Sequence, residues 1–160
     1  SSDLGRPDME RTAFWVPDAY VRDTARVFEV IGALDADIDV NNAGLGRGFG
    51  NLHEAHPEDI DTTIDTNVRA AIQVLRAILP GMLARNRGHL VNMSSVSALH
   101  PLASTVYGAS KAALHLLSQN LRLELAGSRV RVTEICPGRV STEFFDAAIA
   151  WELRRVQAGK

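Results

Sequence analysis

The sequence predicts an α/β fold, a partial doubly wound parallel sheet in three layers with helices on both faces. Short apolar runs that suit strands alternate with longer segments of helical periodicity, which is typical of parallel crossovers. The chain contains no internal repeat and no low-complexity tract. Glycines or small polar residues follow several of the predicted strands, at the carboxyl ends where open α/β sheets bind their ligands.

Composition and charge describe one soluble globular domain. The 160 residues are 46% hydrophobic and 22% charged, with a formal net charge of −2, which gives no electrostatic reason to expect nucleic acid or an anionic membrane as a partner. No run approaches the ~18 apolar residues of a membrane span, and no basic and apolar leader opens the chain. The single cysteine, Cys136, excludes an internal disulfide and suits the reducing cytoplasm; a buried inert thiol is expected.

The first third of the chain is expected to form two strands and one helix. Residues 1–12 have no clear period, residues 13–16 suit a short strand, and residues 21–32 repeat apolar side chains at helical spacing. Residues 37–40 suit a second strand, which breaks into Asn41-Asn42-Ala43-Gly44 and a loop with three more glycines. Such a break allows backbone to approach a ligand closely, although a plain glycine-rich loop has the same composition.

Residues 57–85 are expected to form the clearest helix. Pro57 suits its first turn, and the acidic residues that follow suit the positive end of the helix dipole. The expected buried stripe consists of Ile60, Ile64, Val68, Ala71, Leu75 and Leu79. Asn67 lies next to this stripe, and a buried amide in mid-helix is costly unless it is hydrogen-bonded. It is therefore either an exposed polar residue or a functional one.

The remaining elements repeat the alternation. Residues 89–95 suit a strand that runs into Ser94 and Ser95, and residues 104–127 have a helical period. Residues 129–136 suit a further strand, closed by Pro137-Gly138. Residues 142–160 are expected to form an amphipathic helix.

Tyr107 and Lys111 lie four residues apart near the start of the helix expected for residues 104–127. Residues at i and i+4 share a helix face, so the phenol and the ammonium can point into one cleft. A phenol is a poor base at neutral pH, but a fixed cation lowers its pKa. The pair could then exchange a proton with a substrate alcohol, although the spacing also arises by chance in amphipathic helices.

Five motifs, in this order, resemble those of the short-chain dehydrogenase/reductase (SDR) family. They are Asn41-Asn42-Ala43-Gly44, Asp65-Thr66-Asn67, Val91-Asn92-Met93-Ser94-Ser95, Tyr107-Gly108-Ala109-Ser110-Lys111 and Pro137-Gly138-Arg139-Val140-Ser141-Thr142. The resemblance implies a Rossmann-like fold and an NAD(P)-dependent oxidoreductase that interconverts a secondary alcohol and a ketone. The residues of these motifs are most similar to those of the branch that oxidises 3-hydroxy acids and serine. This similarity implies NADP as the cofactor, with NAD as the alternative.

The resemblance also implies roles for individual residues. Tyr107 would be the general acid/base, and Lys111 would lower its pKa and hold the nicotinamide ribose. Ser95 would hydrogen-bond the reacting oxygen, and Asn67 would hold a water in a proton relay to Lys111. The implied cofactor-binding residues are Asn41, Ala43, Gly44, Tyr107, Lys111, Pro137, Gly138, Val140 and Thr142. No metal site is expected, because the five histidines show no metal-ligand spacing.

The sequence departs from the family pattern in three places. No glycine-rich Thr-Gly-x-x-x-Gly-x-Gly turn precedes Asn41, so the single Rossmann-like domain expected for residues 1–160 lacks its first βαβ nucleotide-binding turn. The strand before Asn41 is short. The serine-to-tyrosine spacing is one residue short, so counting back from Tyr107 selects Ser94, whereas register along the strand selects Ser95. We place the missing residue near Ala103 and expect the chain to be joined pieces of a longer protein.

Two functions from different classes fit these observations. The four implied catalytic residues favour the oxidoreductase. The missing glycine-rich turn favours the alternative, a non-catalytic SDR-like fragment or scaffold that self-associates without competent cofactor binding. An epimerase or dehydratase of the extended branch also uses Tyr-x-x-x-Lys, but the Asn-Asn-Ala-Gly motif argues against membership of that branch. The implied partners are a small-molecule alcohol or ketone and further copies of the chain, in a dimer or tetramer.

Overall fold

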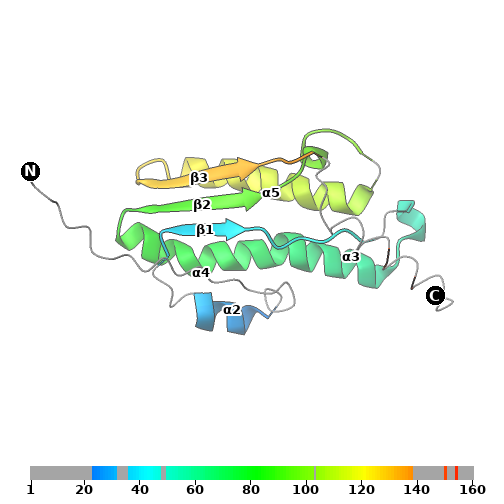
Figure 1. Ribbon diagram of the computed structural model, residues 1–160, viewed down its shortest axis with the longest axis horizontal. Helices are drawn as coiled ribbons and strands as arrows, with labels where there is room; N and C mark the ends of the chain where they lie inside the picture. Colours follow the sequence, from blue (N-terminus) through cyan, green and yellow to red (C-terminus); the bar gives the residue numbers. More distant parts are fainter. Residues whose placement is uncertain are drawn as a thin grey trace, which may run out of the picture.

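The structure, a computed structural model, describes residues 23–31, 36–47, 50–102 and 104–138, together with the single positions 150 and 154. Three parallel strands form one sheet in the order β1 (Ile38–Asn41), β2 (Gly88–Met93) and β3 (Val130–Ile135) (Figure 1). The register pairs Asn41 with Asn92 and Met93 with Ile135. The carboxyl ends of the three strands therefore lie at the same edge of the sheet.

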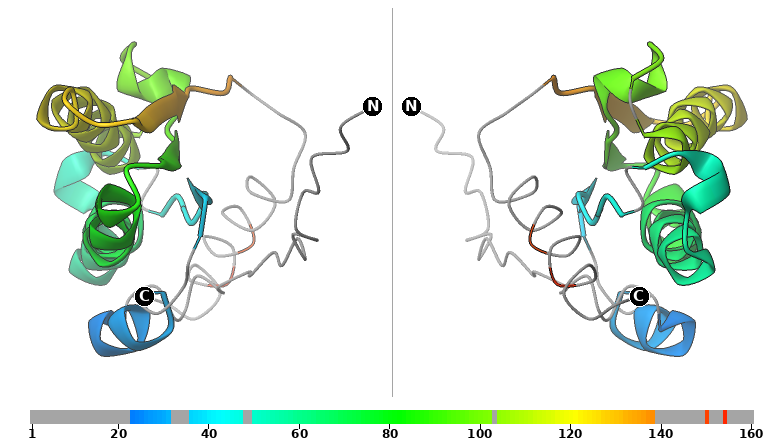
Figure 2. Two further views of the ribbon diagram at one scale, coloured as in Figure 1. Left: turned by 90° about the vertical axis from the view of Figure 1, so that its left-hand side faces the viewer. Right: turned by 90° about the vertical axis from the view of Figure 1, so that its right-hand side faces the viewer.

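The described helices are α2 (Thr24–Ile31), α3 (Pro57–Ile64), α4 (Ala71–Ala84) and α5 (Thr105–Glu124), with short 3-10 turns at Leu52–Glu54 and Val96–Ala98. Viewed from the side, α4 and α5 lie against one face of the sheet, and α2 packs against α4 (Figure 2). This confirms the predicted parallel α/β fold. The strand expected at residues 13–16 and the helix expected at residues 142–160 lie outside the described residues.

A π-helical turn, Asp65–Ala70, joins α3 to α4 within the long helix expected for residues 57–85. A π turn inserts extra backbone and so rotates the buried face of a helix. Before and within this turn the buried side chains are mainly polar: Asp59, Thr62, Thr63, Thr66 and Asn67. The expected stripe is therefore wrong for Ile60, Ile64 and Val68, which are only half-buried. After the turn it is confirmed for Ala71 and Leu75, which are buried, while Leu79 is half-buried and packs against the core.

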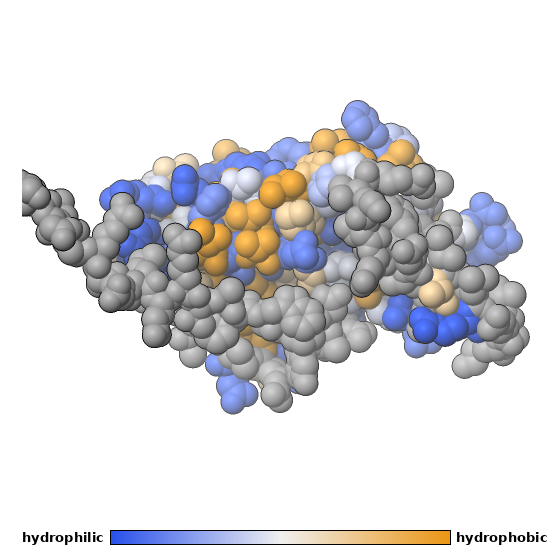
Figure 3. Space-filling view, viewed as in Figure 1, coloured by the Kyte–Doolittle hydropathy of each residue, from blue (hydrophilic) through white to orange (hydrophobic). Residues whose placement is uncertain are grey.

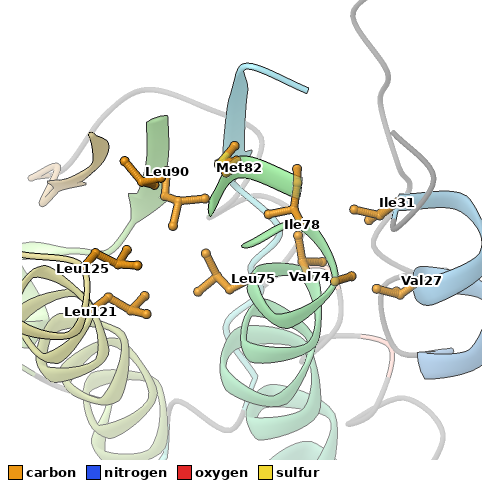
Figure 4. Close-up of a cluster of buried hydrophobic side chains, with 11 residues drawn as sticks. Val27, Ile31, Val74, Leu75, Ile78, Met82, Leu90, Leu121 and Leu125 are labelled. Carbon is orange, nitrogen blue, oxygen red and sulfur yellow. The ribbon is translucent and has the colours of Figure 1, made fainter. Parts of the chain in front are cut away.

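The apolar core fills the space between α2, α4, the end of α5 and the sheet (Figure 4). Its buried members are Val27, Ile31, Val74, Leu75, Ala77, Ile78, Met82, Leu90, Leu121, Leu125 and Val130. Burial of each large apolar side chain contributes about 1.5–3 kcal/mol. A different set of buried residues is polar, and it gathers towards the carboxyl ends of the strands: Asn67, Asn92, Ser94, Ser95, Ser110, Lys111 and Ser118. One half of the interior thus stabilises the fold, while the other half positions polar groups.

The opposite face of the sheet carries exposed apolar side chains among the described residues. Ile38 and Val40 of β1 are 62% and 55% exposed, and Ile135 of β3 is 43% exposed. In the space-filling view, apolar atoms form a patch over the strands on this face (Figure 3). Within the described residues, no helix has the length and apolar character to cross a bilayer.

The entry to α5 is strained at Ser104. Its backbone has φ 135° and ψ 88°, a conformation that residues with a side chain rarely adopt. Its hydroxyl is buried without a hydrogen-bond partner. Strain of this kind costs about 1–3 kcal/mol. It falls next to position 103, near which the sequence comparison placed the missing residue.

Candidate active site

Two serines, Ser94 and Ser95, directly follow β2, and their side chains point in different directions. The Ser94 hydroxyl donates a hydrogen bond of 3.1 Å to the carbonyl oxygen of Lys111 and so ties the strand to α5. The Ser95 hydroxyl lies 2.6 Å from that of Ser97, accepts a 3.2 Å hydrogen bond from the Ser97 N–H, and hydrogen-bonds Tyr107. Adjacent residues of an extended segment point to opposite sides. Ser95 is therefore the serine beside the tyrosine, as register along the strand predicted.

Tyr107 and Lys111 occupy the same face of α5, as their spacing predicted. The ammonium of Lys111 lies 5.8 Å from the centre of the Tyr107 ring. It donates a 2.9 Å hydrogen bond to the carbonyl oxygen of Met93, at the end of β2. Only 4% of Lys111 is exposed. The strand end thus holds a buried cation close to the tyrosine.

Burial controls the pKa values of this pair. Loss of hydration disfavours the ammonium and lowers the pKa of Lys111 to about 8. Burial raises the pKa of Tyr107, and a hydrogen bond from Ser95, which stabilises the phenolate, acts in the opposite direction. The sequence reasoning expected a lowered pKa for Tyr107. The direction is reversed because desolvation of the phenolate outweighs the stabilising contacts.

Asn67 is fully buried and joins three segments. Its Oδ1 accepts a 2.9 Å hydrogen bond from the Leu45 N–H, and its Nδ2 donates to the Leu45 carbonyl oxygen at 2.9 Å. Nδ2 also donates to the Ser110 hydroxyl at 2.9 Å, which in turn donates to the Tyr107 carbonyl oxygen at 2.7 Å. The π turn, of a kind often found at functional sites, therefore connects the loop after β1 to the helix that carries Tyr107.

Gly44 brings backbone next to the catalytic candidates. A Cβ at this position would lie 3.1 Å from the Lys111 ammonium and 3.6 Å from Oδ1 of Asn67. The first distance is shorter than an ordinary van der Waals contact, so a side chain here would displace the ammonium. Glycine at position 44 thus allows the side chains of Lys111 and Asn67 to pack closely against the loop after β1.

A chain of buried polar groups runs beneath the same strand ends. The Asn41 amide donates to Asp39 Oδ2 at 3.0 Å and to Asn92 Oδ1 at 3.1 Å. Asn92 donates to the Ser118 hydroxyl at 2.9 Å, and that hydroxyl donates to the Leu114 carbonyl oxygen. Burial raises the pKa of Asp39 to about 6. This chain fixes β1 and β2 to α5 below the site.

The structure gathers most of the expected cofactor-binding residues. Ala43 and Gly44 follow β1, and the Pro137 carbonyl oxygen accepts a 3.0 Å hydrogen bond from the Val96 N–H, which sets Pro137-Gly138 beside the end of β2. The Asn41 side chain is engaged within the polar chain under the sheet. Val140 and Thr142 lie outside the described residues.

Several residues of the site have roles that the sequence reasoning did not predict. Ser97 holds the hydroxyl of Ser95, Ser110 connects Asn67 to the helix, and Asn92 joins Asn41 to α5. Ser110 lies inside the Tyr-x-x-x-Lys motif, where a polar residue three positions after Tyr107 was the available signal. Cys136, expected to be buried, is half-buried, and burial together with the neighbouring Glu134 carboxylate raises the pKa of its thiol.

Comparison with known proteins identifies the family. A family model described as short chain dehydrogenase matches residues 15–153. The chain belongs to the short-chain dehydrogenase family. This SDR chain is 47% identical over 131 residues to an NADP-dependent 3-hydroxy acid dehydrogenase of Salmonella typhi, a match that covers 78% of the chain and 53% of the relative. The enzyme of the same name from Escherichia coli strain K12 gives the same figures.

Solved structures agree with the SDR fold. A closed form of serine dehydrogenase complexed with NADP+ has a TM-score of 0.78 and 43% identity, with coverage of 81% of this chain and 55% of that one. A short-chain dehydrogenase from Sphingobium yanoikuyae in complex with NADPH has a TM-score of 0.74 and 31% identity, with coverage of 79% and 50%. The SDR chain spans about half the length of the curated relatives that it matches.

Proposed function

We propose that this chain carries the catalytic groups of an NAD(P)-dependent oxidoreductase that interconverts a secondary alcohol and a ketone. One observation carries the proposal: Ser95 hydrogen-bonds Tyr107, and the Lys111 ammonium lies 5.8 Å from the tyrosine ring, at the carboxyl end of a parallel strand. Ligands of open α/β sheets bind at such ends. Family membership agrees with this assignment.

Tyr107 moves the proton of the reacting hydroxyl in the proposed reaction. A bound nicotinamide would supply or accept the hydride. Because burial raises its pKa, Tyr107 is protonated at neutral pH and is ready to donate to a carbonyl oxygen. In the reverse direction the Ser95 hydroxyl stabilises the phenolate that must accept the alcohol proton. The protonation state therefore favours ketone reduction at neutral pH and alcohol oxidation at higher pH.

Lys111 and Asn67 support this proton transfer. An ammonium has three donors, and the Met93 carbonyl oxygen takes one of them. The others would hydrogen-bond hydroxyl groups of the ribose of a bound cofactor. Both amide hydrogens of Asn67 have protein acceptors, so a relay water would bind through the second lone pair of Oδ1. In this assignment Asn67 acts mainly by holding the loop of Gly44 against Lys111.

NADP is the proposed cofactor and a 3-hydroxy acid the proposed substrate class. The support is the name of a 47% identical relative, an NADP-dependent 3-hydroxy acid dehydrogenase. The chain would contribute the loop at Ala43 and Gly44, which lies against Lys111, and the Pro137-Gly138 segment beside the end of β2.

The chain is also proposed to self-associate and to reside in the cytoplasm. Exposed apolar side chains on the long helices, such as Ile72 of α4 and Leu116 of α5, support a dimer or tetramer. Light scattering coupled to size exclusion measures the oligomeric state. The cytoplasmic location rests on a single cysteine in the chain, which suits a reducing compartment.

Fluorescence titration of the 160-residue chain with NADPH and with NADH tests the proposed function. We expect saturable binding of NADPH, with NADH weaker by about tenfold or more, a difference of ~1.4 kcal/mol in binding free energy. Saturable NADH binding that is tighter than NADPH binding would reverse the cofactor assignment. Absence of binding by either dinucleotide would contradict the oxidoreductase and favour the alternative, a scaffold that keeps the fold without competent cofactor binding.

A further inference from the structure

Three potential metal ligands meet on the face of β3 that packs against α5. His115 lies one helical turn beyond Lys111 on α5. Glu134 is the last residue but one of β3, and Cys136 directly follows the strand. One ligand atom from each residue lies within 4.8 Å of the other two. Nδ1 of His115 is 2.8 Å from Oε2 of Glu134. His115 and Glu134 are 19 residues apart in the sequence, so a search for metal-ligand spacing does not find them.

The Glu134 carboxylate is only half satisfied. Its side chain is 6% exposed, and Oε1 is buried without a hydrogen-bond partner. A buried carboxylate oxygen without a partner loses its hydration and gains nothing in return, which is costly. The Cys136 thiol hydrogen-bonds the same carboxylate, but a neutral thiol does not compensate its charge. A cation bound between the two groups would satisfy this oxygen.

We propose that His115, Glu134 and Cys136 bind one zinc ion. Imidazole nitrogen, carboxylate oxygen and thiolate sulfur are the three ligand types that Zn²⁺ takes in proteins, at about 2.0–2.3 Å, whereas Mg²⁺ and Ca²⁺ prefer oxygen alone. Tetrahedral coordination at those lengths separates ligand atoms by about 3.5 Å. Small side-chain rotations bring the present atoms to that spacing and leave a fourth position for water.

The surroundings of the cluster allow an ion to enter and to be held. The His115 side chain is 29% exposed, which gives solvent access. Nε2 of His115 lies 2.7 Å from the Gln119 amide nitrogen. If Nδ1 binds the ion, Nε2 carries the proton. The exposed side-chain amide of Gln119 then flips, so that its oxygen accepts a hydrogen bond from Nε2. Such a partner fixes the tautomer of a metal-bound histidine.

The zinc ion would join the end of β3 to the helix that carries Tyr107 and Lys111. A zinc ion that binds only the folded state stabilises that state by mass action. The ion needs no role in hydride transfer, so its binding can be measured without cofactor or substrate. Zinc binding can therefore be present or absent independently of cofactor binding and turnover.

Equilibrium dialysis of the metal-free chain against Zn²⁺ tests the site directly. We expect one ion per chain, with affinity reduced by at least tenfold in Cys136→Ser and in Glu134→Gln. His53→Ala, which removes an exposed histidine outside the cluster, is the matched control and should bind as the original chain does. Circular dichroism confirms that each variant is folded. Failure of the original chain to bind Zn²⁺, or unchanged affinity in both variants, would overturn the proposal.

Two further readouts identify the ligands without relying on variants. Cys136 is the only cysteine, so Zn²⁺ should slow its reaction with a thiol reagent by at least tenfold. Co²⁺ should bind in place of Zn²⁺ and show a thiolate-to-metal charge-transfer band. Unprotected Cys136 in the presence of bound Zn²⁺, or Co²⁺ binding without that band, would exclude the thiolate as a ligand and contradict the site.

Discussion

The side-chain amide of Asn67 and the backbone of Leu45 exchange two hydrogen bonds of 2.9 Å each. This pairing resembles a strand ladder, but one partner is a side chain at the π turn between α3 and α4. It fixes the loop after β1 one residue beyond Gly44, where the backbone approaches Lys111. The positions of the loop and of the ammonium are therefore coupled through a single asparagine.

Asn67→Ala should lower the free energy of unfolding by about 2–4 kcal/mol. The substitution removes three hydrogen bonds and leaves the Leu45 backbone groups and the Ser110 hydroxyl without their partner. Urea unfolding monitored by circular dichroism measures the change. Asn51→Ala, which removes an exposed amide bonded to Glu54, is the control and should change stability by less than about 0.5 kcal/mol. Equal effects of the two substitutions would show that the Asn67 contacts do not stabilise the loop.

Gly44→Ala should weaken NADPH binding or turnover by about tenfold with little loss of stability. The added methyl group displaces the Lys111 ammonium by a few tenths of an ångström, and misplacement by ~1 Å can cost 10²-fold in rate. Cofactor titration and steady-state kinetics measure the effect. Gly50→Ala adds the same methyl group where no atom lies within 4 Å, and it should behave as the original chain does. Unchanged binding and turnover in Gly44→Ala would contradict the close approach.

Gly88→Ala should destabilise the fold by about 1–3 kcal/mol. Gly88 opens β2 against the fully buried Met82, and a Cβ there would overlap the Met82 side chain. Thermal unfolding measures the loss. Gly127→Ala, where the new methyl group meets open space, serves as the control. A Gly88→Ala variant as stable as Gly127→Ala would show that Met82 can move aside freely.

Asp39→Asn should stabilise the chain at pH 7 but not at pH 4. The pKa of Asp39 is raised to about 6 from 3.8, so the folded state binds more protons between those pH values, and stability falls as pH rises through that window. The asparagine variant lacks this loss. We expect it to be about 1–2 kcal/mol more stable at pH 7. The whole pKa shift, at ~1.4 kcal/mol per pKa unit, would give about 3 kcal/mol, and the expected effect is smaller because the carboxyl is only half-buried.

Urea unfolding at pH 4, 5, 6 and 7 measures that difference. Asp61→Asn, which neutralises an exposed carboxyl on α3, is the matched control and should show no such trend. An Asp39→Asn variant with the same stability difference at all four pH values would contradict a raised pKa.

The sequence predicted the parallel sheet and its helices because their signals are local. Alternating apolar runs and helical periods mark β2, β3 and α5 within a few residues of their observed bounds. The buried face of α3 and of the π turn that follows it was not predicted, since that face is mainly polar and leaves no apolar period to read. Polar residues such as Thr63 and Asn67 fill that face instead.

The candidate site was predicted as a set of residues rather than as an arrangement. Motif order pointed to Ser95, Tyr107 and Lys111, and the structure brings them to one strand end. The pKa direction of Tyr107 could not be predicted, because it depends on how much water burial removes. His115 and Glu134 come together only through the packing of α5 on β3, which spacing in the sequence does not encode.

Turnover by Tyr107→Phe tests whether Tyr107 is the general acid/base. The substitution removes only the hydroxyl that hydrogen-bonds Ser95, so the chain should fold and bind NADPH as before. Tyr20→Phe, the same change at the other tyrosine of the chain, is the matched control. With a 3-hydroxy acid oxidised by the original chain, followed by absorbance of the reduced cofactor, we expect kcat to fall by at least about 10²-fold in Tyr107→Phe and to stay unchanged in Tyr20→Phe. Turnover retained by Tyr107→Phe would contradict the assignment of Tyr107 as the general acid/base.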